Sequence, residues 1–387
     1  MIPYCYVTAA SEQDTAIEAL VRAPIIGIDI EGASLYRYVD RVCLIQISDA
    51  HTHYIFDPLL LNSIAPLGTI LENRSILKIV HGADYDCLAL KRDFGFQVGP
   101  LFDTALAARA TGLKPYSLQA LVERFFAVPF PKTHQKSDWS RRPLSLDQLA
   151  YAAGDTAYLL RLHDILKLEA EQRGRLSQIE EECRVIETLT WPAKPFDRND
   201  YTRIKGATVL PVAVQRILRE LVALRDRIAR EEDRPPFRII SHHDLFTLSR
   251  AEPRDSKQLL GLFARPRSVL IRHMPLWLKA IEIGLTTTEP FPGTTKSKRP
   301  HLTVSQERQL VKLTNWRNQQ AIDEGVEPAM IMNNVTLKAV VLAHPMEVAA
   351  LLPILRGWQS HRYGQTLVNL IAEPHPPCPP SPTESTE

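Results

Sequence analysis

The sequence predicts an α/β domain with one central sheet, followed by two small all-helical domains. Three observations support this prediction: strand-like apolar runs occur early in the chain, helical periodicity dominates afterwards, and two stretches have the composition of linkers. The chain has 387 residues, more than one ordinary core requires, so two or three domains are expected. Its 45% apolar and 23% charged content is that of a folded globular protein.

The expected strands are short runs rich in β-branched and other apolar residues, separated by polar turns. They cover residues 25–31, 42–48, 52–56 and 75–80. Beyond residue 84 the apolar positions follow a helical period, and this pattern continues to residue 184. Strands that come first and helices that then pack on them indicate a sheet flanked by helices.

Two stretches of the chain have linker composition. Residues 191–211 carry three prolines and one glycine among charged residues, and residues 286–300 are rich in Thr, Pro and Lys. The last residues are rich in Pro, Ser and Thr and are expected to be disordered. The predicted division is a first domain over 1–192, a linker over 193–210, a helical domain over 211–286, a linker over 287–301, a second helical domain over 302–372 and a tail over 373–387.

The two helical segments match each other at an offset of 92 positions. At this offset Arg225 falls on Arg317, and Pro236 falls on Pro328. Prolines paired at one fixed offset favour an internal duplication over chance.

Charge is distributed unevenly along a chain whose net charge is only +2. Residues 212–299 contain 17 Lys and Arg against 10 Asp and Glu. Such an excess either attracts a polyanion or belongs to a solvated helical surface, and composition alone does not decide between these two.

The composition favours a cytoplasmic protein without a membrane anchor. The five cysteines are odd in number and show no Cys-x-x-Cys spacing, which fits reduced thiols. The first ten residues lack the basic and apolar regions of a signal peptide. The apolar stretch 335–355 is interrupted by charged residues and a proline, so it is too polar to span a bilayer. Nothing in the sequence indicates an obligate protein partner.

Two carboxylates lie close together in the first expected strand. Asp29 and Glu31 are two positions apart, so both side chains point to one face while Ile28 and Ile30 point to the other. Like charges side by side on a strand repel each other. A bound divalent cation makes such a pair favourable, so a metal site is the interpretation that we favour over a solvated turn.

A second acidic pair follows the strand that ends near residue 80. Asp84 and Asp86 both fall in the first turn of the next expected helix. One of them could cap that helix or offset its dipole, and the other would then be available to a ligand. The spacing does not choose between them.

A third segment places a phenol beside a carboxylate. Ser145 and Gln148 form a capping-box pattern, so a helix is expected to begin there. Tyr151 and Asp155 are then one turn apart on the same face. Taken alone, this pair would be more typical of an exposed helix surface than of a functional site.

Together the three segments resemble the motifs of the DEDD exonuclease superfamily, in its tyrosine subtype, and the ribonuclease D family in particular. The matching stretches are Ile-Asp-Ile-Glu at 28–31, His-Gly-Ala-Asp-Tyr-Asp-Cys-Leu at 81–88 and Tyr-Ala-Ala-Gly-Asp at 151–155, with connecting stretches at 102–104, 116–122 and 137–144. By this resemblance Asp86, rather than Asp84, is the second-motif carboxylate. The helical repeats resemble the HRDC domain, most clearly over 224–240, and the second copy is more divergent.

The resemblance implies a ribonuclease H-like fold and a 3′→5′ exoribonuclease. It also implies two divalent metal ions, Mg²⁺ or Mn²⁺, bound by Asp29, Glu31, Asp86 and Asp155. Tyr151 would orient the attacking water. The expected substrate is RNA with a single-stranded 3′ end, such as a tRNA precursor, and the products would be nucleoside 5′-monophosphates.

Four further residues are candidates for substrate binding. Leu35 and Tyr36 follow the first motif and could pack against terminal bases, while Lys78 and His81 could hold backbone phosphate. Two alternative functions remain at this point: a DNA 3′→5′ exonuclease, whose metals would act on the same phosphate chemistry, and a non-catalytic RNA-binding protein.

Overall fold

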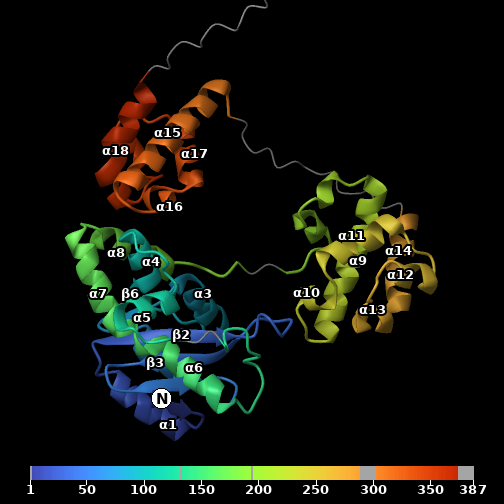
Figure 1. Ribbon diagram of the computed structural model, residues 1–387, viewed down its shortest axis with the longest axis horizontal. Helices are drawn as coiled ribbons and strands as arrows, with labels where there is room; N and C mark the ends of the chain where they lie inside the picture. Colours follow the sequence, from blue (N-terminus) through green and yellow to red (C-terminus); the bar gives the residue numbers. More distant parts are fainter. Residues whose placement is uncertain (1, 131–132, 193–194, 288–301, 374–387) are drawn as a thin grey trace, which may run out of the picture.

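A computed structural model of the protein describes residues 2–130, 133–192, 195–287 and 302–373. It shows the α/β domain and two helical bundles that were predicted (Figure 1). Nearly all of the second predicted linker and of the predicted disordered tail lies outside the described residues.

The first domain is built on a six-stranded mixed sheet with the order β1-β4-β3-β2-β5-β6. Strand β2 lies near its centre, antiparallel to β3 and parallel to β5. Two short strands, β1 and β6, were not predicted from the sequence. The strands are β1 (Cys5–Val7), β2 (Ile25–Gly32), β3 (Val42–Ser48), β4 (His53–Phe56), β5 (Leu77–Val80) and β6 (Leu101–Asp103).

Helices cover the sheet and enclose the core of the domain. Gly27 of β2 permits close packing, because a Cβ atom there would lie 3.0 Å from Ser48 Oγ and 3.2 Å from Leu159 Cβ. The helices are α1 (Ala10–Leu20), η1 (Ala65–Leu67), α2 (Gly68–Leu71), α3 (Ala83–Phe94), α4 (Thr104–Ala110), α5 (Leu118–Phe126), α6 (Leu146–Ala157), α7 (Leu159–Gln172) and α8 (Leu176–Glu187).

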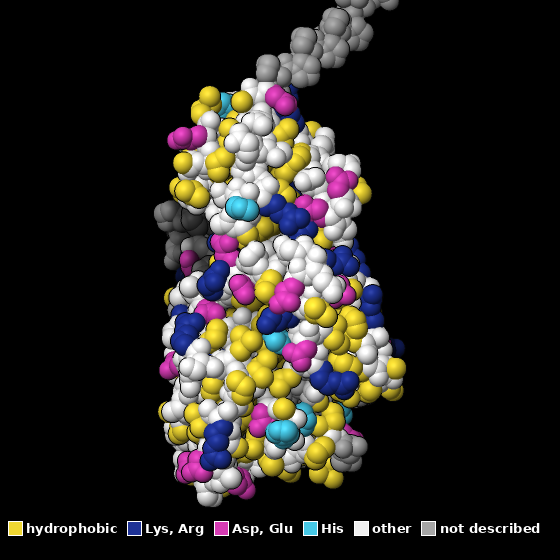
Figure 2. Space-filling model, turned by 90° about the vertical axis from the view of Figure 1, so that its left-hand side faces the viewer, with side chains coloured by type: hydrophobic (Ala, Val, Ile, Leu, Met, Phe, Trp, Pro, Cys, Tyr) yellow, Lys and Arg dark blue, Asp and Glu magenta, His cyan; other side chains and the backbone are white. Residues whose placement is uncertain are grey.

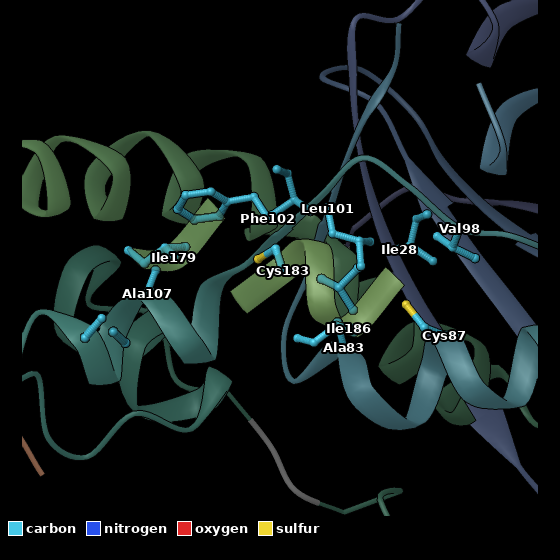
Figure 3. Close-up of a cluster of buried hydrophobic side chains, with 14 of the residues drawn as sticks. Ile28, Ala83, Cys87, Val98, Leu101, Phe102, Ala107, Ile179, Cys183 and Ile186 are labelled. Atoms are coloured by element: carbon cyan, nitrogen blue, oxygen red, sulfur yellow. The ribbon is translucent and has the colours of Figure 1, made fainter. Parts of the chain in front are cut away.

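Helix α8 closes the core beside β6. Figure 3 shows Phe102 of β6 close to Ile179 and Cys183 of α8, whereas Cys87 of α3 lies at the other end of the cluster, beyond Ile186. Both cysteines are buried and form no disulfide, and the sulfur of Cys183 accepts a hydrogen bond from Asp103 N at 3.4 Å.

The first helical bundle begins earlier than the sequence suggested. Residues 198–210 were predicted as linker, yet they form two 3-10 helices, and Tyr201 and Ile204 lie in the bundle core because their apolar side chains complete it. The elements are η2 (Arg198–Arg203), η3 (Ala207–Val209), α9 (Val212–Glu231), α10 (Pro236–Ile239), α11 (His242–Ala251), α12 (Ser256–Gly261), α13 (Ser268–Arg272) and α14 (Met274–Thr286).

The second bundle begins with the same order of three α-helices as the first. Its first three helices start 92 positions after α9, α10 and α11, the offset found in the sequence. This agreement supports the predicted duplication. The elements are α15 (Val304–Asp323), α16 (Pro328–Ile331), α17 (Asn334–Ala343), η4 (Val348–Leu351) and α18 (Gly357–Ala372). No described helix is both long and apolar enough to cross a membrane.

The second bundle packs on α8 through α18, and Glu327 of the bundle pairs with Arg109 of α4 at 3.2 Å. The second bundle and the first domain share one continuous surface in Figure 2. The carboxylate of Glu181 in α8 accepts hydrogen bonds from the backbone N–H groups of Gly357 at 2.6 Å and Trp358 at 2.9 Å. Glu181 therefore caps the N-terminus of α18 from another domain. Arg175 pairs with Glu324 across the same interface.

The first bundle meets the loop between β2 and β3. The hydroxyl of Tyr38 in this loop donates to Asp226 Oδ1 and accepts from Arg230 Nε, each at 2.8 Å. The guanidinium of Arg238 lies 4.1 Å from the ring centroid of Tyr36. The loop that follows the first acidic motif is thus held by the first bundle.

Candidate active site

Strand β2 brings Asp29 and Glu31 to one face of the sheet. Ile28 and Ile30, on the other face, are buried in the core. This is the alternation expected of a strand. Asp29 and Glu31 line a cavity of about 310 Å³, and Tyr151 and Asp155 line the same cavity.

Helix α3 supplies the carboxylate of the second motif. Asp86 is buried. After burial itself, the charges of Asp29, Asp103 and Asp155 raise its pKa. Asp84 is exposed on the same helical turn. The structure therefore places Asp86 with the other motif carboxylates and Asp84 towards solvent, a distinction that spacing did not provide.

Neither of these aspartates caps α3. The cap comes from Asp103 at the end of β6, which accepts hydrogen bonds from Gly82 N at 2.9 Å and Ala83 N at 3.0 Å. The same carboxylate accepts from Ala105 N and Leu106 N at the start of α4. One residue thus fixes two helix N-termini, and Gly82 enters the turn at a φ of 83°, where glycine is favoured.

Helix α6 presents Tyr151 and Asp155 one turn apart. It begins at the predicted capping box, where Ser145 Oγ accepts from Gln148 N at 3.2 Å. Ala152 and Ala153 are fully buried, so these small side chains let the helix lie close to the sheet.

The four motif carboxylates share an environment that opposes their charged form. Loss of hydration raises the pKa of Asp29 to about 7. The pKa values of Glu31, Asp86 and Asp155 are raised well above the ordinary range, first by burial and then by the neighbouring carboxylates. Among the described residues, no Lys, Arg or His forms an ion pair with any of the four.

The phenol of Tyr151 lies close to these carboxylates. Burial, followed by the charges of Asp155 and Glu31, raises the pKa of Tyr151. The phenol is therefore protonated at neutral pH and can donate a hydrogen bond, but it is a poor base.

The donor set fits hard divalent cations. It consists of carboxylate oxygens only, which suit Mg²⁺ or Mn²⁺ better than zinc. Within the described ranges, no three His, Cys, Asp or Glu side chains meet the geometry of an assembled metal site. The fit therefore rests on the chemistry of the donors and on four mutually repelling carboxylates that lack a cationic partner in the described protein.

Comparison with known proteins assigns the domains. Residues 4–171 match the 3′-5′ exonuclease family, and residues 214–281 and 306–371 each match the HRDC domain. Ribonuclease D of Xanthomonas oryzae is 32% identical over 260 residues, covering 67% of this chain and 71% of that protein. The chain belongs to the ribonuclease D family. It is a ribonuclease D-like 3′-5′ exoribonuclease and hence a hydrolase.

Two further relatives and one solved structure are similar to this chain. Ribonuclease D of Pseudomonas paraeruginosa is 27% identical over 360 residues, covering 90% of this chain and 92% of that protein. Exosome complex exonuclease RRP6 of Saccharomyces cerevisiae is 32% identical over 265 residues, but the chain spans only 36% of its length. Escherichia coli RNase D has the same fold, with a TM-score of 0.67 at 23% identity, covering 96% of this chain and 99% of that one.

Of the residues predicted to bind substrate in this ribonuclease D-like site, His81 lies in the cavity and Lys78 does not. His81 lines the cavity, with Nδ1 lying 2.9 Å from Thr104 Oγ1. Lys78 does not: it is fully buried, and Nζ donates to the carbonyl oxygens of Asn73 and Gly99. Because Lys78 is buried, donates to two backbone carbonyl oxygens and does not line the cavity, the prediction that it holds phosphate is wrong in this structure.

Leu35 and Tyr36 lie in the loop after β2 but not in the cavity wall. Leu35 is exposed, and the hydroxyl of Tyr36 donates to Lys136 O at 2.6 Å. Their role in base stacking therefore stays a prediction for RNA that extends beyond the cavity.

Sequence reasoning missed part of the ribonuclease D cavity wall. Its additional lining residues come from α5, α7 and the segment before α6, and they are Ser117, Leu118, Gln119, Phe130, Gln135 and Leu159. The stretch 116–122 had carried a family resemblance, and this was the available signal. Residues 130 and 135 carried none.

Proposed function

We propose that this ribonuclease D-like enzyme removes nucleotides from the single-stranded 3′ end of RNA by two-metal-ion hydrolysis. The observation that carries the proposal is the convergence of Asp29, Glu31, Asp86 and Asp155 without any cationic partner in the described protein. A bound divalent cation would make four ionised carboxylates favourable together at neutral pH.

Each carboxylate has a proposed place. Asp29, Glu31 and Asp155 would hold the ion nearer the attacking water, whereas Asp86, together with Asp29, would hold the second ion. When bound, Mg²⁺ or Mn²⁺ would lower the pKa of water and neutralise charge on the phosphate. The protein's own part is to hold these oxygens rigidly on a central strand and two helices.

Tyr151 would orient the attacking water. Its raised pKa keeps the proton on the phenol, so the hydroxyl donates or accepts a hydrogen bond without acting as the base. His81 would contact the substrate as a neutral group, because burial lowers its pKa.

The substrate is proposed to be structured RNA with a free 3′ end, such as a tRNA precursor in the cytoplasm. Family membership supports RNA, and the Escherichia coli relative is described as an exoribonuclease involved in structured RNA processing. Relatives named as exosome components extend the proposal to other RNAs that need trimming.

The decisive experiment compares a 3′-tailed RNA with the matching DNA, in Mg²⁺, in Mn²⁺ and in a chelator. Metal-dependent release of nucleoside 5′-monophosphates from the RNA is expected. Asp86→Asn should abolish hydrolysis while RNA is still bound, and Asp84→Asn, on the exposed side of the same turn, should not. Faster loss of DNA would refute the RNA assignment, and full activity of Asp86→Asn would refute the site.

A further inference from the structure

We propose that Arg142 and Asp57 are positioning residues for the phenol of Tyr151, and that they act through the indole ring of Trp139. The proposal rests on the function proposed above for Tyr151. It concerns a network that lies outside the cavity and that none of the three acidic motifs includes.

The network starts at a carboxylate that is completely buried. Asp57, which directly follows β4, is 0% exposed. Arg142 donates to it twice, from Nε to Oδ2 at 2.5 Å and from Nη2 to Oδ1 at 2.7 Å. Tyr6 donates its hydroxyl proton to Oδ2, and Leu59 N donates to Oδ1 at 3.0 Å. Each oxygen thus accepts two hydrogen bonds, so this carboxylate has a role in holding Arg142.

Arg142, held by Asp57, in turn binds the backbone of the segment before α6. Beyond its two bonds to Asp57, Nη1 donates to the carbonyl oxygens of Trp139 and Arg141, each at 2.7 Å. Nη2 donates to Cys43 O of β3 at 2.9 Å. These five bonds match the five N–H groups of a guanidinium, which lysine cannot reproduce.

The indole ring of Trp139 connects this held backbone to Tyr151. Its side chain is only 1% exposed and packs with Leu149, Ala152 and Ala153. The indole centroid lies 6.1 Å from that of Tyr151, with the ring planes at 34°. Among the described residues the buried indole Nε1–H has no hydrogen-bond partner, so no polar contact of the side chain with them holds this ring. The position of the indole ring therefore depends on packing and on the hydrogen bond from Arg142 to the carbonyl oxygen of Trp139.

Helix α6 itself does not need this network. It carries its own capping box at Ser145 and Gln148, and it packs on β3 and β4. What depends on Arg142 is the location of residues 139–142, and through them one wall beside the phenol. A shift of this wall would change the direction of the Tyr151 hydroxyl more than it would change the carboxylates on β2 and α3.

The test is a double-mutant cycle on the full chain, measured by steady-state hydrolysis of a 3′-tailed RNA over a range of RNA concentrations at saturating Mg²⁺. Arg142→Lys is expected to lower kcat about 10-fold, with KM nearly unchanged, because small displacements of a positioned group cost rates of this order. In the Tyr151→Phe background the same change should have almost no effect, since the hydroxyl it positions is gone.

Arg141→Lys is the matched control, because the Arg141 side chain is exposed and pairs only with Asp138 in the described contacts. It should leave kcat unchanged in both backgrounds. If circular dichroism shows Arg142→Lys to be unfolded, Trp139→Phe takes its place in the cycle. Equal effects of the change in both backgrounds, or a change in KM alone, would overturn the proposal. An inactive wild-type protein would instead refute the proposed nuclease function.

Discussion

At the scale of single residues, the site stores electrostatic repulsion that a ligand can relieve. Asp29 and Glu31 sit on a central strand whose opposite face belongs to the apolar core. Their raised pKa values mean that the folded protein holds their protons more tightly than the unfolded chain does. These carboxyl groups are therefore expected to lower the free energy of unfolding when metal is absent.

The sign of this effect gives a prediction for metal-free protein. A carboxyl whose folded pKa is raised stabilises the fold at low pH, and this contribution is lost as pH rises from about 4 towards about 7. Wild type in a chelator should therefore lose melting temperature relative to Asp29→Asn over this window. Added Mg²⁺ should restore wild type more than the variant.

Asp14→Asn provides the control, because Asp14 is exposed on α1, away from the cavity. Parallel melting curves of wild type and Asp29→Asn across the whole pH range would contradict the prediction.

The residue scale also shows how far sequence patterns reach. Strand alternation and a capping box were enough to place Asp29 beside Glu31 and Tyr151 beside Asp155. The choice of Asp86 over Asp84 depended on where the axis of α3 points, and Asp103, far along the chain, fixes that axis. Local spacing cannot contain this information.

At the scale of elements, close backbone approach decides which helices can pair. In the first bundle, a Cβ atom on Gly284 of α14 would lie 2.5 Å from Ile217 Cα of α9. Glycine at this position therefore permits the main helix contact of the bundle.

Gly284→Ala is expected to destabilise the first bundle by about 1–3 kcal/mol, because the added methyl group forces the two backbones apart. Chemical denaturation followed by circular dichroism measures the loss. Gly261→Ala is the control: no heavy atom of the described residues lies within 4 Å of the corresponding Cβ, and alanine favours α12. Equal stability of the two variants would show that the α9–α14 contact tolerates the methyl group.

The elements that sequence reasoning missed have a common cause. Strands β1 and β6 are three residues long and lie at the two edges of the sheet. Such short segments carry too few positions to show alternation. The residues around Tyr201 had proline-rich neighbours and so were predicted as linker, although burial of that ring in the bundle outweighs the local composition.

At the scale of the whole molecule, the two bundles are attached to the first domain in different ways. The second is held by buried ionic contacts, in which Arg175 and Glu324 are 4% and 14% exposed. The hydroxyl of Tyr363 donates to the same glutamate. The first bundle contacts the loop between β2 and β3 through more exposed groups.

Glu324→Ala should therefore weaken the docking of the second bundle, at a cost of about 3–5 kcal/mol, because it leaves Arg175 buried without its partner. A lower melting temperature and a larger radius of gyration in small-angle X-ray scattering are expected. Glu347→Ala, an exposed change in the same bundle, is the control. An unchanged radius with unchanged melting would refute the role of this ion pair.

The first bundle is the better candidate for contacts with RNA outside the cavity. Arg254 and Lys257 are exposed, and neither forms an ion pair among the described contacts. Reversing both charges should raise KM for a structured RNA and reduce the salt dependence of binding by about one phosphate contact per residue. Hydrolysis of a dinucleotide should stay unchanged, because neither residue lines the cavity. An equal loss on both substrates would indicate damage to the active site.

The apolar core of the first domain continues into the second bundle without interruption. Residues such as Leu313 and Leu367 belong to the same buried cluster as Ile28 and Leu162. During synthesis the apolar surface of the first domain beside α4 and α8 is therefore fully covered only after α15 to α18 of the second bundle have been made. Chains that stop before residue 302 would leave the ribosome with that surface exposed. They should be substrates for chaperones and proteases even though every proposed catalytic residue is already present.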